Sequence, residues 1–461
     1  MMHRNRILAG IVAATISMAA LAGATPEEAK KLGGELTPFG AEAGANSDGS
    51  IPAYDGGLAA MKSLPKTNPS KASYPDPFAD EKPLFKITAQ NIAQYKDQVT
   101  PGLQALIKRY PDYYLNVYPT RRTASYPDWV NANTLKNATN AKLVGDIDGD
   151  GVEGAYGGIP FPIPKSGTEV IWNHYLRWQG TYRYNRTQNF LIDTGGGVTD
   201  LGDLNFYYAH PYYDKTKDSL PDNRPFYTVA KTVFDSPVTV AGTAYLFQYP
   251  LNFAKQDQVT WFYSPGQRRV RRAPEFKYDT PVASYGGACT YDEIDGIAGR
   301  LDRFEWKIVG KKEMYLQYNN YKLNANVINR TQAFTPKYEN PAMERWEKHR
   351  VWVVEGKLRA GARHAASRKT LYFDEDTWAL YASESYDQAG NIWRVGSFSR
   401  FLLYPETVAE GGFAGLVYDF SKGNYLAVFY HATDADRIEI STKLPNMSTL
   451  SPEAMSGMGV Q

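Results

Sequence analysis

The feature that most constrains the fold is a long series of short strand-like segments separated by turn residues. After about residue 180, segments rich in β-branched and aromatic residues follow one another along the chain. They span 181–185, 189–193, 226–234, 243–249, 258–263, 267–272, 303–309, 350–355, 369–373, 379–386, 392–402 and 425–431. Turns rich in Gly, Pro and Asp lie between them, at 195–197, 264–266, 374–376 and 387–390. Because short turns join antiparallel neighbours, the series predicts a mainly β (α+β) chain whose large antiparallel sheet curls on itself.

The part of the chain before this series has fewer strand signals and more turn chemistry. Residues 25–80 are rich in Gly, Pro, Ala and Ser, which predicts an irregular arm. Helices are expected at 26–32, at 89–99 after Thr88, at 103–110 after Pro101 and around 171–176 after Thr168, whereas 111–165 is expected to be loop-rich. We therefore divide the chain into a signal (1–24), an arm with lid helices (25–125), a sheet body (126–440) and a flexible tail (441–461).

The first residues have the three parts of a bacterial secretory signal. Arg4 and Arg6 give a basic start, 7–22 is largely apolar, and Ala22 and Ala24 supply small residues at the cleavage site. A transmembrane anchor is the alternative, but the apolar run is short for a span of about 20 residues and no charged stop-transfer pattern follows. The sequence predicts cleavage after Ala24 and export to the periplasm. No cysteine follows the cleavage site, so no N-terminal lipid anchor is expected.

Charge and cysteine content exclude several classes of function. The chain has 51 Lys and Arg against 49 Asp and Glu, and loss of Arg4 and Arg6 with the signal would leave these charges balanced. A balanced chain lacks the basic footprint of a nucleic-acid-binding protein, so no nucleic-acid partner is expected. Cys289 is the single cysteine, which rules out an intramolecular disulfide or a cysteine zinc cluster. We expect it to be a small buried hydrophobic residue.

Motifs for catalysis, metals and cofactors are weak. Asp146, Asp148 and Asp150 are spaced like the start of a calcium loop, but Gly157 stands where a bidentate Glu belongs. An Asp-Gly turn is therefore the better interpretation, and no metal site is expected. The chain has no HExxH, GxSxG or Walker motif. We expect no cofactor and no enzymatic activity.

The densest basic cluster lies at 268–272. If this segment is a strand, Arg269 and Arg271 lie on one face of it. One interpretation is solvated charge on an edge strand, which discourages aggregation. The other is a guanidinium pair that contacts a lipid head group or a partner protein.

Several strings in the chain resemble one family. They are GIPFPIPKSGTEVIWNH at 158–174, WFYSPGQRRVRR at 261–272, YDEI at 291–294, FEWKIVGKKEMY at 304–315, RVWVVE at 350–355, LYFDEDTW at 371–378 and YD at 386–387. Together they resemble the Gram-negative proteins grouped as domain of unknown function 1329. That family is similar in turn to the lipoprotein-carrier and outer-membrane-lipoprotein-sorting superfamily.

The resemblance implies a fold and a setting. It implies an antiparallel half-barrel over 126–440 that curls around an apolar cavity, with helices as a lid. The Gly/Pro-rich arm is a further candidate for the lid. It also implies a periplasmic protein that works beside an exporter of the resistance-nodulation-division type and an outer-membrane partner. The resemblance supplies no catalytic residues.

We therefore expect a periplasmic carrier of a lipid or another hydrophobic small molecule. Aromatic side chains supply large contact area with few rotatable bonds, which makes them the candidates for lining the cavity. The candidates, chosen by strand parity and by the motifs above, are Trp172, Phe190, Phe247, Trp261, Tyr263, Trp306, Tyr315, Trp352 and Trp393. Two alternatives stay open: a non-catalytic structural or accessory subunit of an envelope transport complex, and a carbohydrate-binding or carbohydrate-active β protein.

Overall fold

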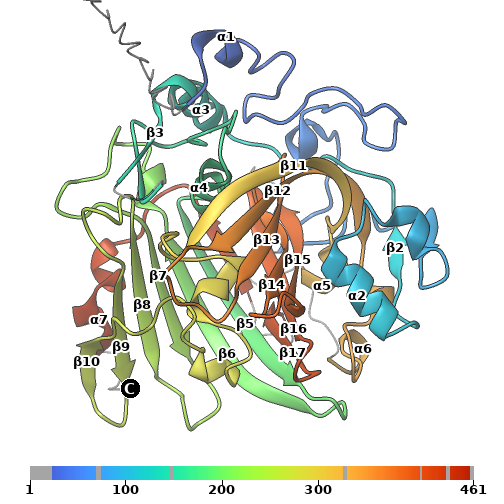
Figure 1. Cartoon of the computed structure of the whole chain (residues 1–461). Coiled ribbons are helices and arrows are strands. Elements are labelled where there is room, and N and C mark those ends of the chain that lie inside the picture. The colour runs from blue at the N-terminus through green and yellow to red at the C-terminus, as the bar shows by residue number, and fades with distance from the viewer. Residues whose placement is uncertain are drawn as a thin grey trace, which may run out of the picture.

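A strongly curled sheet forms the body of the protein (Figure 1). The computed structural model describes residues 23–68, 74–145, 147, 149–324, 330–404, 408–431 and 437–456. Within these residues the sheet has 16 strands, in the order β1-β2-β12-β13-β14-β15-β16-β17-β5-β6-β7-β8-β9-β10, with β11 beside β12 and β18 beside β5. In the part described, its ends β1 and β10 do not pair with each other. The sheet is thus an open curl, which confirms the expected mainly β half-barrel.

The elements have the following bounds. The strands are β1 (Phe85–Ile87), β2 (Leu115–Val117), β5 (Tyr182–Ile192), β6 (Val198–Ala209), β7 (Phe226–Phe234), β8 (Ala244–Pro250), β9 (Val259–Ser264), β10 (Arg269–Arg272), β11 (Phe304–Gln317), β12 (Trp346–Leu358), β13 (Arg368–Asp374), β14 (Leu380–Tyr386), β15 (Ile392–Leu403), β16 (Val408–Asp419), β17 (Tyr425–Tyr430) and β18 (Arg437–Ser441). A separate pair is β3 (Lys142–Val144) and β4 (Gly151–Glu153). The α-helices are α1 (Pro26–Ala29), α2 (Pro101–Arg109), α3 (Asp128–Asn140), α4 (Gly167–Tyr175), α5 (Tyr321–Asn324), α6 (Arg330–Ala333) and α7 (Pro452–Ser456). Short 3₁₀ turns include η3 (Ile92–Tyr95), η5 (Ala283–Tyr285), η6 (Tyr291–Gly296) and η8 (Met447–Leu450).

Several strands of the sheet differ from the sequence prediction. The segments at 181–185 and 189–193 are one long strand, β5, and the strands β6, β16 and β18 were not predicted. In β6, a β-bulge interrupts the alternation that a sequence search relies on. Gly202 occupies this bulge with φ +114°, where a Cβ atom would lie 1.9 Å from the carbonyl oxygen of Ser236.

The helices were predicted with mixed success. α2 and α4 confirm the helices at 103–110 and around 171–176, although Ser166 rather than Thr168 caps α4. The helix at 89–99 is wrong, because only the short turn η3 forms there. Helix α3 lies in a region where loops were expected. Its Asn- and Thr-rich sequence has low helix propensity, which is why no helix was predicted there. Burial of Val130 and Ala138 against the core stabilises it instead.

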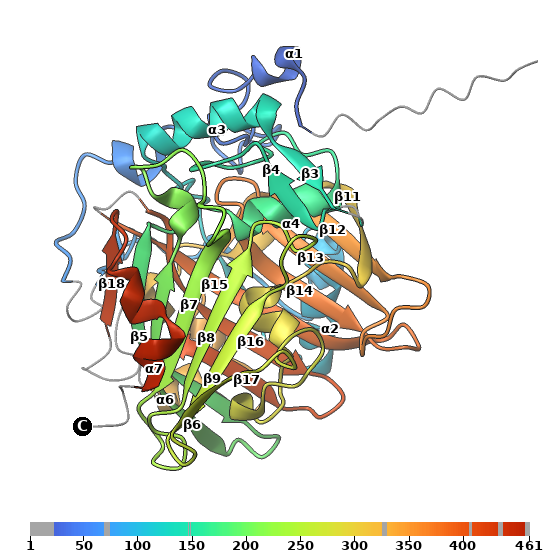
Figure 2. The ribbon, with the colours of Figure 1, turned by 90° about the vertical axis from the view of Figure 1, so that its left-hand side faces the viewer.

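Side chains cover both faces of the curl. On β16 and β17, Leu416 and Ala427 face the outer core, whereas Val417 and Val428 face the inner one. Helix α2, from the region where lid helices are expected, packs on the outer face against β15. The outer face of β7 to β9 is covered by the C-terminal turn η8 and helix α7 (Figure 2). Leu450 and Met455 are buried there, so this part of the expected flexible tail is packed on the sheet.

The inner face is covered mainly by an irregular stretch between β10 and β11. We call residues 273–303, which include η5 and η6, the covering segment. Its turn η5 contacts β5, and its turn η6 contacts β14 and β15. The covering segment therefore crosses the open side of the curl (Figure 1).

Residues 1–22 of the expected signal (1–24) lie outside the described residues. Among the helices that the structure describes, none has the length and apolar character needed to cross a bilayer.

A pair of buried carboxyl groups lies under the outer face. Glu339 and Glu344 are 0% and 1% exposed and hydrogen-bond to each other. The hydroxyl of Tyr430 donates to Glu339, and that of Tyr113 donates to Glu344 at 2.9 Å. Burial raises the pKa of both carboxyl groups above the ordinary value, so the folded protein favours a protonated pair.

This pair predicts a pH-dependent effect of Glu339→Gln. The raised pKa of Glu339 contributes stability that is complete below the ordinary value of 4.5 and is lost as pH rises through the folded-state value. The amide cannot ionise, so thermal unfolding between pH 5 and 8 should favour the variant over the native protein increasingly as pH rises. The gain should be about 1.4 kcal/mol for each unit by which the pKa is raised. The exposed Glu305→Gln should show no such trend, and a pH-independent difference for Glu339→Gln would contradict the assignment.

Candidate functional site

A cavity lies between the inner face of β6, β7 and β8 and the covering segment. Its volume is about 70 Å³. The lining residues are mostly aromatic or apolar: Phe206, Tyr208, Ala230, Thr232, Phe234, Tyr245, Phe247, Tyr249, Val282, Ser284, Tyr285, Tyr291, Ile294 and Phe429. The site thus joins three consecutive strands with residues of η5 and η6.

Strand pairing explains why a hollow forms here. In the ladder, Thr232 of β7 lies between Phe206 and Tyr245. Two residues along the same strand, Ala230 lies between Tyr208 and Phe247. The middle strand therefore presents small side chains between rows of rings on both sides. Because alternate residues of a strand share a face, this pattern leaves a groove floored by β7 and walled by aromatic rings.

The cavity continues into a more polar space of about 90 Å³. Tyr208, Tyr249 and Ile294 line both spaces, so the two adjoin. The polar space is also lined by His174, Arg177, Gln179, Arg183, His210 and Asp295. A ligand that spanned both spaces would place an apolar part among rings and a polar part among cationic groups.

His210 is a buried polar group of this space whose hydrogen bonding is incomplete. It is 6% exposed, and its Nδ1 lies 3.0 Å from the hydroxyl of Thr228. Its Nε2 has no hydrogen-bond partner among the described residues. Burial, together with Arg183 and Arg177, lowers the pKa of His210 to about 3. The ring is therefore neutral at ordinary pH, and a ligand could hydrogen-bond to Nε2.

Three acidic side chains of η6 hold the covering segment to the sheet. Asp292 accepts from Lys369 at 2.7 Å and lies 2.9 Å from His364, Glu293 accepts from Arg394 at 2.6 Å, and Asp295 accepts from Arg177 at 2.6 Å and from Arg400 at 2.8 Å. We call Asp292, Glu293 and Asp295 the acidic latch. Despite the opposing effect of burial, these cations lower the pKa of Asp292 and of Asp295, so both carboxyl groups stay ionised.

The candidate residues from the sequence lie on different faces of the sheet. Of the nine, Phe247 lines the cavity. Trp172, Trp306 and Trp352 belong to the inner core, where Trp172 donates to the carbonyl of Gly149 and Trp306 to that of Leu301. Phe190 and Tyr315 lie in the outer core near α2, Trp261 and Tyr263 near α7, and Trp393 lies under the guanidinium of Arg394.

Most cavity residues were missed by the sequence analysis. The alternating rings Tyr245, Phe247 and Tyr249 were a usable signal, because period-two spacing places them on one face. Those of β6 were obscured by the bulge at Gly202, and Tyr285 and Tyr291 lie in irregular structure that periodicity cannot assign.

The charged candidates lie elsewhere. Arg269 and Arg271 are exposed on the edge strand β10, where Arg271 pairs with Glu275 at 2.8 Å. Of the weak calcium candidates, Asp146 and Asp148 lie outside the described residues. Both oxygens of Asp150 accept from Arg300, at 2.8 and 2.6 Å.

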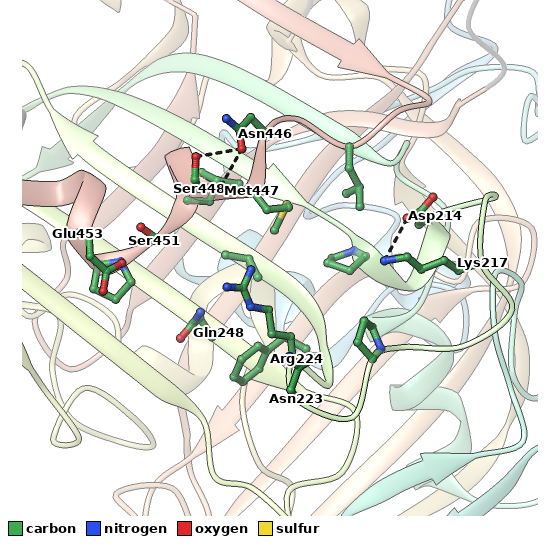
Figure 3. A pocket seen from close by; sticks show the side chains of 17 residues that line it. Asp214, Lys217, Asn223, Arg224, Gln248, Asn446, Met447, Ser448, Ser451 and Glu453 are labelled. Atoms are coloured by element: carbon green, nitrogen blue, oxygen red, sulfur yellow. Dashed lines mark hydrogen bonds and ion pairs between the residues drawn. The ribbon is translucent and has the colours of Figure 1, made fainter.

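A larger groove lies on the outer face, between η8, α7 and the strands β7 and β8 (Figure 3). Its volume is about 710 Å³, and its lining includes charged and amide side chains such as Asp214, Lys217, Arg224 and Gln248. This polar lining offers an apolar molecule less contact than the ring-lined cavity does.

The acidic latch predicts local opening in Asp295→Asn. Asn tolerates the left-handed backbone at this position, φ +53°, but removes the charge that Arg177 and Arg400 contact. Removing one partner of a buried ion pair costs about 3 kcal/mol or more. Amide hydrogen exchange in 283–297 should therefore quicken by about two orders of magnitude.

The matched control is Asp257→Asn, which removes an exposed ion pair of 2.6 Å to Lys277 of the same segment. It should leave the exchange of 283–297 unchanged, because exposed pairs contribute little. Equal exchange in Asp295→Asn and the native protein would show that the latch does not hold the segment.

Three solved structures that are similar to this chain have low sequence identity to it. A domain from Vibrio parahaemolyticus, named for outer membrane lipoprotein sorting, is 12% identical with a TM-score of 0.42 and covers 62% of this chain and 97% of its own. A DUF1329 family protein from Desulfovibrio piger is 15% identical with a TM-score of 0.42, covering 63% and 97%. A LolA superfamily protein from Nitrosomonas europaea is 10% identical with a TM-score of 0.35, covering 63% and 99%.

Sequence comparison gives a firmer relationship. An uncharacterised protein of Pseudomonas aeruginosa is 40% identical over 427 residues, which are 92% of this chain and 90% of the relative. The family model described as "Protein of unknown function (DUF1329)" matches residues 86–456. The chain therefore belongs to the DUF1329 family, which confirms the resemblance inferred from its sequence motifs.

Proposed function

We propose that this protein is a periplasmic carrier that binds a lipid or another lipophile in the cavity beneath the covering segment. The observation that carries the proposal is the groove floored by Ala230 and Thr232 and walled by aromatic rings. Rings provide apolar contact with few rotors to immobilise, and each buried methylene of a ligand contributes about 0.8 kcal/mol.

In this proposal, the small cavity corresponds to a closed state of the carrier. A volume of about 70 Å³ accommodates only a small part of an acyl chain. A longer ligand would therefore need the covering segment to move away from β6 to β8, which would open the rest of the inner face. The acidic latch supports this role, because it holds the segment by polar contacts that can break without unfolding the sheet.

The state of Asp295, the acidic residue that lines the adjoining polar space, also supports a carrier over a catalytic site. Asp295 is engaged by two guanidinium groups, and its lowered pKa makes it a poor proton donor. The proposal therefore includes no enzymatic step and no cofactor.

The wider setting rests on the sequence. The basic and apolar start, with cleavage after Ala24 and no lipid-acceptor cysteine, supports a protein released into the periplasm. There we propose that it passes hydrophobic cargo between an inner-membrane exporter of the resistance-nodulation-division type and an outer-membrane protein.

The test is ligand binding with a filled cavity. The purified protein would be extracted for mass spectrometry, then delipidated and titrated with a fluorescent lipophile. Ala230→Phe places a ring in the floor of the groove and should weaken binding at least about tenfold, with circular dichroism to verify the fold. Val238→Phe, at a 95% exposed position of a loop, is the control of equal side-chain size.

Two outcomes would contradict the proposal. One is a folded protein that neither co-purifies with a lipophile nor binds the probe. The other is a probe affinity that Ala230→Phe leaves equal to that of Val238→Phe.

A further inference from the structure

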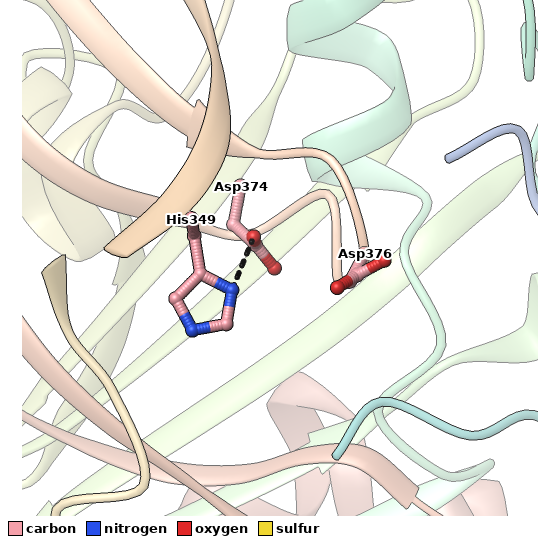
Figure 4. Close-up of side chains that lie close together, drawn as sticks. All are labelled: His349, Asp374 and Asp376. Carbon is pink, nitrogen blue, oxygen red and sulfur yellow. Dashed lines mark ion pairs between the residues drawn. The ribbon is translucent and has the colours of Figure 1, made fainter. Parts of the chain in front are cut away.

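A compact group of potential metal ligands lies apart from the cavity, where β12 meets the turn between β13 and β14. Among the described residues, His349, Asp374 and Asp376 offer ligand atoms that all lie within 4.8 Å of one another (Figure 4). All three side chains are at most 2% exposed. Neither the family match nor the carrier proposal assigns a role to this group.

The turn after β13 fixes the two carboxylates. Asp374 is the last residue of β13, and its Oδ2 accepts from the amide and the hydroxyl of Thr377, at 2.9 and 2.7 Å. The hydroxyl of Tyr318 lies 3.3 Å from the same oxygen. These contacts hold Asp374 in one orientation, and they leave its Oδ1 to face His349 (Figure 4).

The surroundings of His349 define which ring nitrogen carries the proton. Its Nε2 lies 3.3 Å from Oε2 of Glu347, and the ring stacks on Tyr318 with centroids 3.8 Å apart. Since a carboxylate only accepts hydrogen bonds, Nε2 donates to Glu347, which leaves Nδ1 as the ring nitrogen that a metal ion could approach. A carboxylate that orients a histidine in this way is the usual support of a metal-bound imidazole.

Two potential ligand atoms face each other in a buried space. Nδ1 of His349 lies 3.7 Å from Oδ1 of Asp374, and this oxygen has no hydrogen-bond partner among the described residues. The separation is too long for a hydrogen bond. It is a few tenths of an ångström longer than the roughly 3.4 Å between two ligands of a tetrahedral metal ion, each about 2.0–2.1 Å from it.

The ion pairs of the cluster leave the carboxylate of Asp374 without a Lys or Arg partner among the described residues. Asp376 is paired with Arg122 at 2.7 Å, Glu347 with Arg345 at 2.6 Å, and Glu375 with Lys311 at 3.0 Å. No Lys or Arg of the residues the structure describes lies within ion-pair distance of Asp374. A buried carboxylate without a counter-ion is costly, so a divalent cation between Asp374 and His349 would complete the charge balance.

We propose that His349, Asp374 and Asp376 bind a divalent metal ion, with Zn²⁺ as the best match to one imidazole and two carboxylates in a buried site. Arg122 orients Asp376 through both of its oxygens, at 3.0 and 2.7 Å, and leaves each oxygen a second lone pair for the metal. The ion ties β12 to the β13–β14 turn. The same turn holds the N-terminal arm, because Trp378 donates to the carbonyl of Phe39 at 2.9 Å.

Metal titration of the purified protein tests this assignment. After treatment with EDTA and dialysis, the protein should bind one Zn²⁺ per chain, and ZnCl₂ should raise its thermal midpoint. CoCl₂ should produce the visible absorption of a four-coordinate site. Elemental analysis of the protein as purified gives the resident ion.

Two variants and one control locate the site. Asp374→Asn keeps an oxygen for Thr377 and gives His349 an amide donor, so it should fold normally yet bind Zn²⁺ at least about 100-fold more weakly. His349→Gln should do the same. His364→Gln, which alters a buried histidine that lies 2.9 Å from Asp292, should retain native affinity.

The proposal is overturned if the native protein binds no stoichiometric Zn²⁺ and its thermal midpoint does not respond to it. It is equally overturned if Asp374→Asn binds Zn²⁺ as tightly as the native protein. Because none of these measurements involves a lipophile, their failure is separate from failure of the carrier proposal.

Discussion

The contacts of the acidic latch attach the covering segment to the sheet, and the proposed closed state depends on them. The sheet is an open curl, so its inner face over β5 to β8, β14 and β15 would be exposed to water if nothing covered it. The covering segment has little regular structure and few backbone hydrogen bonds to the strands below it. Carboxylates at Asp292, Glu293 and Asp295 supply the attachment, because they meet buried cations on β13 and β15 and beside α4. Desolvated ion pairs of this kind are sensitive to geometry, which makes the attachment specific.

In the proposed carrier, the aromatic rings would contact the ligand, whereas the acidic latch would position the covering segment. Apolar contact is non-directional and can accept ligands of different lengths, whereas the pairs at η6 require one position of the segment. The hollow over Ala230 and Thr232 lies directly beneath this attachment. A ligand that entered there would compete with the packing of Tyr285 and Tyr291 on β6 to β8 before it disturbed any strand pairing.

The sequence predicted the class of fold better than the site. Alternating strands and turns are local signals, and they were enough to predict an open antiparallel curl. The cavity depends on register, which places small residues of β7 opposite rings of β6 and β8, and register is set by turns and bulges such as that at Gly202. Asp292 and Glu293 were visible within a family string, but their partners Lys369 and Arg394 lie far along the chain. His349 and Asp374 are likewise brought together only by the pairing of β12 with β13.

The covering segment is joined to the sheet at both ends, and this has a mechanical consequence. At one end it continues into β10, the last strand of the sheet, and at the other into β11, which is paired with β12 in the opposite part of the curl. Any widening of the curl therefore moves the two attachment points of the segment relative to each other. The width of the half-barrel and the position of the covering segment are therefore coupled. A partner protein that moved the strands apart from the outside would also displace the covering segment.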